Sequence, residues 1–213
     1  MTKLLIIRHG QSQANLQGVF VGHTNSPLSD LGKQQAEITA DYVVANYHID
    51  AVYSSDLERA FYTGKAVADR LGMVPIPERG MREIFAGDWE TVKFDTLSTE
   101  YGEPYQLWLR NIGLAQCTNG ESIAQLQSRV VDALRRIAEA NDGKTVVVAT
   151  HATPIRTFMH HCSGLPMEEM KNTPWVSNAS VTTVEYADGK FTIVTPGYDA
   201  HLGELRTALP KNV

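Results

Sequence analysis

The chain has 213 residues, a net charge of −5 at neutral pH and a pI near 5.8. This length fits one folded domain over residues 1–213 with a sizeable core. The acidic balance and the scattered basic residues disfavour a nucleic-acid partner. Two cysteines make no disulfide framework, and the apolar run after Met1 is too short for a signal peptide or a membrane span. We therefore expect a cytoplasmic protein without membrane contact.

The first predicted strand ends directly in polar and charged residues. Residues 3–7 are apolar after the initial lysine, which is typical of a strand covered on both faces. Arg8, His9 and Gly10 follow at once. Open parallel sheets build their sites outside the carboxyl ends of their strands, so the sequence predicts a functional site here.

The next stretch predicts two helices, a short strand and an edge strand. A helix is expected over residues 30–46, and residues 51–53 predict a strand. A second helix is expected from Asp56, as its N-cap, to Leu71, with Arg59 on its first turns. Residues 74–77 contain two prolines, which favour an edge strand over a central one.

The second half of the chain alternates between helix and strand patterns. Residues 80–118 lack a strand pattern and predict loops and short helices, of which 90–118 form a small helical lid over the strand edge. An amphipathic helix is expected over 121–140 and a β-branched strand over 145–149. Residues 179–196 predict a hairpin around Asp-Gly. The alternation predicts an α/β fold, a three-layer α/β/α sandwich with a mostly parallel central sheet.

Three predicted strand ends carry the same kind of residue. They bring Arg8, His9, Arg59 and His151 to one edge of the sheet. Two guanidiniums and two imidazoles suit a small dianion such as a phosphoryl group. Two arginines beside the imidazoles would repel a metal dication, so we expect neither a metal nor another cofactor.

Short motifs follow one another between residue 3 and about residue 160. They are Arg8-His9-Gly10-Gln11-Ser12 with Asn15, then 22–28, 32–36, 54–63, Glu83 with 87–90, and Thr150-His151 with 154–156. In this order they resemble the histidine phosphatase superfamily, the phosphoglycerate-mutase-like group. Three positions depart from that pattern. Thr91 and Ala152 stand where the family often has glycine, and Asn25 stands on the loop facing the substrate where an acidic residue is common.

We interpret His9 as the nucleophile, which forms a phosphohistidine. It must be neutral to attack, and two neighbouring cations disfavour its protonation. Arg8 and Arg59 would neutralise the phosphoryl oxygens. His151 is interpreted as a second imidazole, which if protonated would stabilise the transferring group as a cation.

A carboxylic acid is needed to protonate the leaving oxygen. Four acidic residues lie close together in the sequence, and only the resemblance selects one of them, Glu83, over Glu78, Asp88 and Glu90. The resemblance also implies that several smaller residues complete the phosphate pocket. These are Ser12, Asn15, Gly22 and the backbone amide of Ala152.

The function expected first is metal-independent hydrolysis of small phosphomonoesters. A phosphoglycerate mutase, which returns the phosphoryl group to a sugar acid, would use His9 identically. The short predicted lid and Gln11, where mutases usually have glutamate, favour the phosphatase. A non-catalytic phosphate-binding module would be expected to have lost the nucleophile or the acid. The expected partner is a small phosphorylated metabolite, and a homodimer through a sheet edge fits this fold.

Overall fold

A six-stranded sheet forms the centre of the molecule in the computed structural model, which describes residues 1–208. The strand order is β3-β2-β4-β1-β5-β6. β1 pairs in parallel with β4, β4 with β2, and β2 with β3, whereas β5 and β6 are antiparallel. The strands are β1 (Thr2–Arg8), β2 (Ala51–Ser54), β3 (Ile76–Pro77), β4 (Thr145–Thr150), β5 (Val181–Ala187) and β6 (Lys190–Tyr198).

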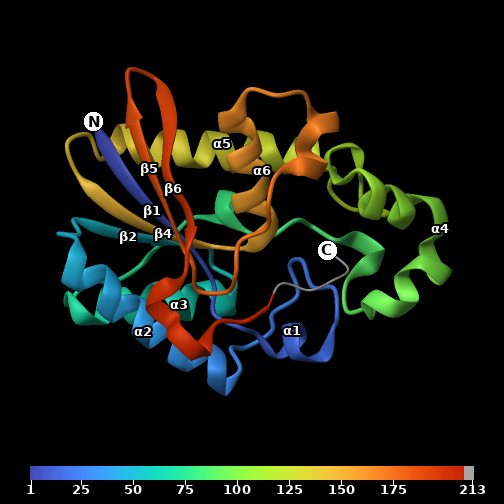
Figure 1. Ribbon diagram of the computed structural model, residues 1–213, viewed down its shortest axis with the longest axis horizontal. Helices are drawn as coiled ribbons and strands as arrows, with labels where there is room; N and C mark the ends of the chain where they lie inside the picture. Colours follow the sequence, from blue (N-terminus) through green and yellow to red (C-terminus); the bar gives the residue numbers. More distant parts are fainter. Residues whose placement is uncertain (209–213) are drawn as a thin grey trace.

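Helices cover both faces of this sheet (Figure 1). Alternate residues of a strand point to opposite faces, and β1 shows this directly. Leu4 and Ile6 pack in one apolar cluster with α5 (Ile123–Ala140) and α6 (Ala152–Ser163). Leu5 and Ile7 pack in a second cluster with α2 (Asp30–Asn46) and α3 (Glu58–Arg70). The predicted three-layer sandwich with a mostly parallel sheet is therefore confirmed.

The carboxyl ends of the three parallel strands β2, β4 and β1 meet at one edge of the sheet. In the register of the sheet, Arg8 lies opposite Thr150, and Ser54 lies opposite Ala149. The residue that follows each strand, His9, His151 or Ser55, is consequently delivered to the same place. The prediction that these strand ends lie together at one edge of the sheet is confirmed.

The start of α3 differs from the prediction. Leu57, not Asp56, is the N-cap residue, and its side chain makes no capping bond. The carboxylate of Asp56 instead accepts two hydrogen bonds from the Arg82 guanidinium, both 2.6 Å long. The Arg82 pair gives the carboxylate two donors that carry an opposite charge, whereas a cap would bond it to an uncharged backbone N–H, which explains why Asp56 is drawn away from the helix. The pair also ties α3 to the segment that carries Glu83.

Residues 80–118 hold loops and short helical segments, as expected from the sequence. Two 3-10 turns, Arg79–Met81 and Gly87–Trp89, precede α4 (Phe94–Arg110), and a third, Ile112–Leu114, follows it. The helix α4 is broken at Gly102, whose φ of 49° is non-helical. It lies to one side of the sandwich in Figure 1. Its role as a lid remains a prediction.

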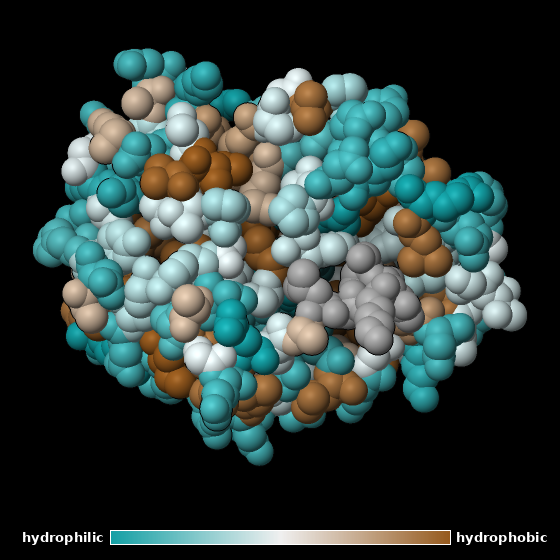
Figure 2. Space-filling view, in the orientation of Figure 1, coloured by the Kyte–Doolittle hydropathy of each residue, from teal (hydrophilic) through white to brown (hydrophobic). Residues whose placement is uncertain are grey.

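The remaining elements are short. They are α1 (Gln13–Gln17) and the 3-10 helices Met167–Asn172 and Ala200–Leu205. On the face drawn in Figure 2, hydrophilic side chains surround separate small patches of apolar ones. Within residues 1–208, no helix combines the length and the apolar character needed to cross a membrane.

Thr91 is predicted to strain the backbone. It has a φ of 66°, in the left-handed region that β-branched residues disfavour, and its side chain is exposed. Thr91→Gly removes about 1–2 kcal/mol of backbone strain from the folded state. Glycine also gives the unfolded chain more conformational entropy, which costs about 0.5–1 kcal/mol of stability, so the strain relief is the larger effect. Urea denaturation is expected to show stability higher by about 0.5–1 kcal/mol at an unchanged m-value.

Thr99→Gly is the matched control, because Thr99 is exposed within α4. Glycine in a helix interior lowers stability, so the two Thr→Gly substitutions are expected to have opposite signs. A loss of stability in both variants would contradict the assignment of strain to Thr91.

Candidate active site

His9 lies directly after β1, with its ring buried at the edge of the sheet. Its Nδ1 is 2.6 Å from the carbonyl oxygen of Gly10. A carbonyl can only accept, so Nδ1 carries the ring proton and Nε2 keeps a free lone pair. Gly10 itself packs closely against α2, where a Cβ would come within 2.3 Å of the Gly32 carbonyl oxygen. A side chain at position 10 would therefore push His9 out of place.

Two buried guanidiniums flank His9, and backbone carbonyls hold both of them. Arg8 donates from Nη1 to Val176 O (2.6 Å), whereas its Nε has no hydrogen-bond partner within residues 1–208. Arg59 donates to Gly22 O (2.8 Å) and Thr24 O (3.1 Å). Burial lowers the pKa of Arg8 to about 10, so it stays charged at neutral pH. The carbonyls orient these cations without neutralising their charge.

His151 faces His9 from the end of β4. The two ring centroids are 5.2 Å apart, in an edge-to-face arrangement. The Nε2 of His151 is 2.9 Å from the Ser55 hydroxyl, and its buried Nδ1 has no partner in the described part of the chain. Burial first, and then the charge of Arg59, lowers the pKa of both histidines well below 6.5. Both shifts favour the neutral form of the imidazole. A cationic role for His151 stays a prediction.

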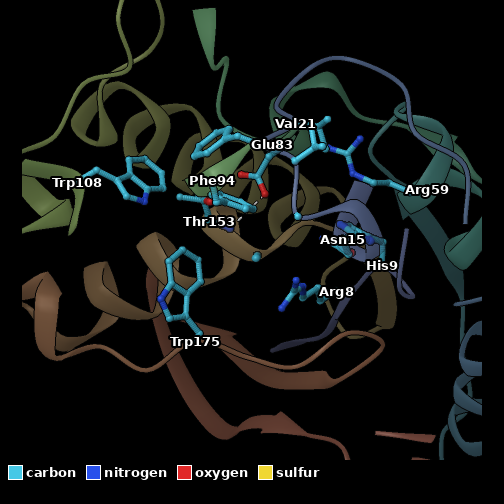
Figure 3. A pocket seen from close by; sticks show the side chains of 14 residues that line it. Arg8, His9, Asn15, Val21, Arg59, Glu83, Phe94, Trp108, Thr153 and Trp175 are labelled. Carbon is cyan, nitrogen blue, oxygen red and sulfur yellow. Dashed lines mark hydrogen bonds between the residues drawn. The ribbon is translucent and has the colours of Figure 1, made fainter. Parts of the chain in front are cut away.

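Glu83 projects into the same pocket from the opposite side (Figure 3). Its Oε1 accepts from the Ile84 backbone N–H (2.8 Å) and its Oε2 from the Thr153 N–H (3.4 Å). Burial raises the pKa of Glu83 above its usual 4.5, although these hydrogen bonds and Arg59 act against the rise. The other three acidic candidates do not line this pocket. Geometry therefore selects Glu83, as the resemblance did.

Arg129 of α5 holds the segment that carries Glu83, and the sequence did not indicate this. A guanidinium has five N–H donors, and here each of them has an acceptor. The bonds run to Gly80 O (2.9 Å), Arg82 O (2.8 Å), Glu83 O (2.7 Å) and both carboxylate oxygens of Glu121 (2.7 and 2.8 Å). A charged residue on an amphipathic helix is usually solvated, so only the tertiary structure reveals this contact.

The backbone of Glu83 has one further support. The His23 side chain lies with its Nε2 2.9 Å from the Glu83 carbonyl oxygen. Because the carbonyl accepts, that ring nitrogen carries the proton. His23 and Arg129 together fix the position of the Glu83 main chain.

Asn15 and Ala152 line the pocket as expected, whereas Ser12 and Gly22 do not. Ser12 is the N-cap of α1: its hydroxyl accepts from the Asn15 N–H (3.2 Å), and the Asn15 side chain returns the bond (3.0 Å). Gly22 offers its carbonyl to Arg59, and its N–H donates to Glu90 (3.0 Å). Ser12 and Gly22 therefore contact residues that line the pocket and, like His151, are not lining residues themselves. Their part in the phosphate pocket stays a prediction.

The pocket encloses about 810 Å³ of space, part of which is open solvent. Its polar end is formed by Arg8, His9, Arg59 and Glu83, and its other end by aromatic and aliphatic side chains (Figure 3). Within residues 1–208, no group of three or more His, Cys, Asp or Glu side chains is arranged to hold a metal ion.

Comparison with known proteins agrees with this site. Residues 4–199 match the family model described as histidine phosphatase superfamily (branch 1). The chain belongs to this superfamily. Phosphoserine phosphatase 1 of Hydrogenobacter thermophilus is 29% identical over 96% of both chains. Phosphoglycerate mutase-like protein 4 of Arabidopsis thaliana is 32% identical over 95% of this chain and 87% of its own.

Among solved structures, the Bacillus stearothermophilus protein YhfR superimposes with a TM-score of 0.90 at 26% identity. The match covers 95% of this chain and all of that one. The chain is therefore similar over nearly its whole length to proteins named as phosphatases and as mutase-like, and these names leave the substrate open.

The protonation states of the two histidines can be measured directly. Nitrogen-15 NMR is expected to show His9 as the Nδ1–H tautomer, with His9 and His151 both titrating well below 6.5. Arg59→Gln is expected to raise the pKa of His9 toward 6.5, since Arg59 is the first cation that opposes protonation of its ring. Arg136→Gln, on the exposed side of α5, is the control and should leave both pKa values unchanged. A His9 that titrates near 6.5 in the parent protein would contradict this account.

Proposed function

We propose that this protein is a phosphatase that hydrolyses small phosphomonoesters through a phosphohistidine on His9. One observation carries the proposal. The free Nε2 lone pair of a neutral imidazole lies in a single pocket with two buried guanidiniums and a buried carboxyl group. A nucleophile, two cations for the phosphoryl oxygens and a proton source are the groups that this reaction needs.

The phosphoryl group would bind where buried donors lack acceptors. Arg8 Nε and His151 Nδ1 have no partner in the described residues, and an unpaired buried donor is costly. Phosphoryl oxygens would accept from both, as well as from the N–H groups of Arg59 that no carbonyl occupies. In this arrangement His151 serves as a neutral donor, in its Nδ1–H tautomer.

Two chemical steps follow from this arrangement. In the first, His9 Nε2 bonds to phosphorus, the bond from phosphorus to the ester oxygen breaks, and Glu83 gives its proton to the departing alkoxide. In the second, a water oxygen bonds to phosphorus while the Glu83 carboxylate takes a water proton, and the phosphorus–nitrogen bond breaks. Inorganic phosphate leaves, and both residues return to their starting states.

Burial supports both roles at once. The first step needs a neutral imidazole and a protonated carboxyl group, and burial favours the neutral form of each. It lowers the pKa of His9 and raises that of Glu83. The range of pH in which both groups are in the required state is therefore wider than it would be in water.

Hydrolysis is favoured over isomerisation because the pocket opens to solvent, so water can reach the phosphohistidine. The identity of residue Gln11 does not support hydrolysis over isomerisation, because its side chain lies outside the pocket. Its side chain accepts from the Ser29 hydroxyl (2.8 Å) and does not line the pocket. Residues 90–118 are proposed to act as a lid, because Phe94 and Trp108 of α4 form part of the pocket wall.

The decisive experiment measures phosphate release from phosphomonoesters in EDTA, with 3-phosphoglycerate isomerisation assayed in parallel. We expect release without isomerisation, an acid-labile phosphohistidine after rapid quenching, and a loss of about 10⁴-fold or more in His9→Ala. Isomerisation faster than release would identify a mutase. Activity that EDTA abolishes and metal restores, or activity that survives in His9→Ala, would overturn the mechanism. Turnover no higher than that of His9→Ala would identify a binding module.

The proton donor can be tested through the leaving group. Butanol needs a proton to depart, whereas p-nitrophenolate leaves without one. Glu83→Gln is expected to lower kcat/KM for butyl phosphate by about 10²–10⁴-fold and for p-nitrophenyl phosphate much less. The parameter kcat/KM is chosen because it reports the first transfer, before Glu83 acts as a base.

Arg129→Lys is expected to shift the same ratio of substrates in the same direction, by a smaller factor. Lysine cannot supply the planar set of five donors that holds the Glu83 segment. Arg136→Lys, on an exposed part of α5, should leave the ratio unchanged. Equal losses on both substrates in Arg129→Lys would indicate a general structural role for Arg129 and would contradict its positioning of Glu83.

A further inference from the structure

The pocket extends beyond the phosphoryl-binding end, and its far walls are apolar. Figure 3 shows Trp108 and Trp175 at one end, well separated from His9 and Arg59 at the other. These walls come from three separate parts of the chain. They are Val19 and Phe20 after α1, Phe94 and Trp108 of α4, and Trp175 before β5.

Every charged side chain that lines the pocket lies at the phosphoryl end. Among the lining residues within 1–208 these are Arg8, Arg59 and Glu83. The two arginines are committed to the phosphoryl oxygens in the mechanism above. A carboxylate on the alcohol half of a substrate would therefore find no free lining cation, and Glu83 would be the charged group that it met.

A further cation, which contacts the lining residue Trp175, is already engaged. Arg156 of α6 lies against the Trp175 ring, with its guanidinium carbon 4.3 Å from the ring centroid. It donates to Thr173 O (2.7 Å) and, from Nη2, to Met170 O and Lys171 O (both 3.2 Å). These bonds hold the guanidinium behind the indole, where it fixes an apolar wall and does not reach a ligand.

We propose, on the basis of the phosphatase function above, that the alcohol half of the natural substrate is uncharged and apolar, with an aromatic or branched aliphatic group. Removing such a group from water against these walls favours binding. A carboxylate in the same place would lose its hydration without gaining a partner. Phosphoserine and 3-phosphoglycerate are then poor substrates, although several relatives are named as phosphoserine phosphatases.

The test compares kcat/KM for benzyl phosphate, butyl phosphate and phosphoserine. All three are primary alkyl esters whose alcohols need a proton to leave. Differences in kcat/KM among them therefore reflect contacts with the pocket walls more than the departure of the alcohol. We expect benzyl phosphate to exceed phosphoserine by about 10²-fold, with butyl phosphate between them. Phosphoserine equal to or better than benzyl phosphate would overturn this inference alone. Hydrolysis of none of the three would instead overturn the phosphatase function.

Trp175 and Phe94 line the apolar wall and are only half-buried, so replacing them leaves the fully buried core residues in place. Trp175→Ala and Phe94→Ala are each expected to lower the ratio of kcat/KM for benzyl phosphate to that for phosphoserine about tenfold. An unchanged ratio in both folded variants would show that the apolar walls do not contact the alcohol group.

A gain of function provides the opposite test. Val19→Lys places a cation in the half-buried wall, and we expect it to raise kcat/KM for phosphoserine relative to benzyl phosphate about tenfold. Val74→Lys is the matched control, because Val74 is 81% exposed and does not line the pocket. No change in Val19→Lys, or the same change in both variants, would contradict the proposal.

Discussion

Burial of the His9 and Glu83 side chains is the constraint on which this site depends. The first chemical step needs an imidazole without a proton at His9 and a carboxyl group with one at Glu83. Both are the uncharged forms, and burial favours the uncharged form of any titratable group. The same effect therefore lowers the pKa of His9 and raises that of Glu83. Full exposure of these two side chains would return both pKa values toward those of the free groups.

The buried cations are held mainly by main-chain carbonyls. Arg8, Arg59 and Arg156 donate to backbone oxygens, and Arg129 does so in addition to its pair with a carboxylate. A carbonyl dipole orients a guanidinium but leaves its full charge, whereas a carboxylate would cancel it. At Arg8 and Arg59 this preserves the charge that phosphoryl oxygens require. At Arg129 the same chemistry fixes the main chain around the acid.

Much of the fold was predictable, because hydrophobic periodicity and turn residues are local signals. The helix over 30–46, the edge strand with its prolines, and the Asp188-Gly189 hairpin all appear as expected. The prediction that failed depends on a distant partner. Asp56 does not cap α3, because Arg82 binds its carboxylate. No local pattern indicates which of two competing contacts a side chain will make.

By itself, the sequence determined which residues come to the sheet edge. Arg8, His9 and His151 follow buried strands directly, and parallel strands deliver their carboxyl ends to one place. The tertiary structure alone decided the protonation states of these residues and the contacts of Arg129, because both depend on groups far away in the chain. It also decided the apolar walls of the pocket, which three separate segments build. Strand ends are local features of a chain, whereas burial and pocket shape belong to the whole fold.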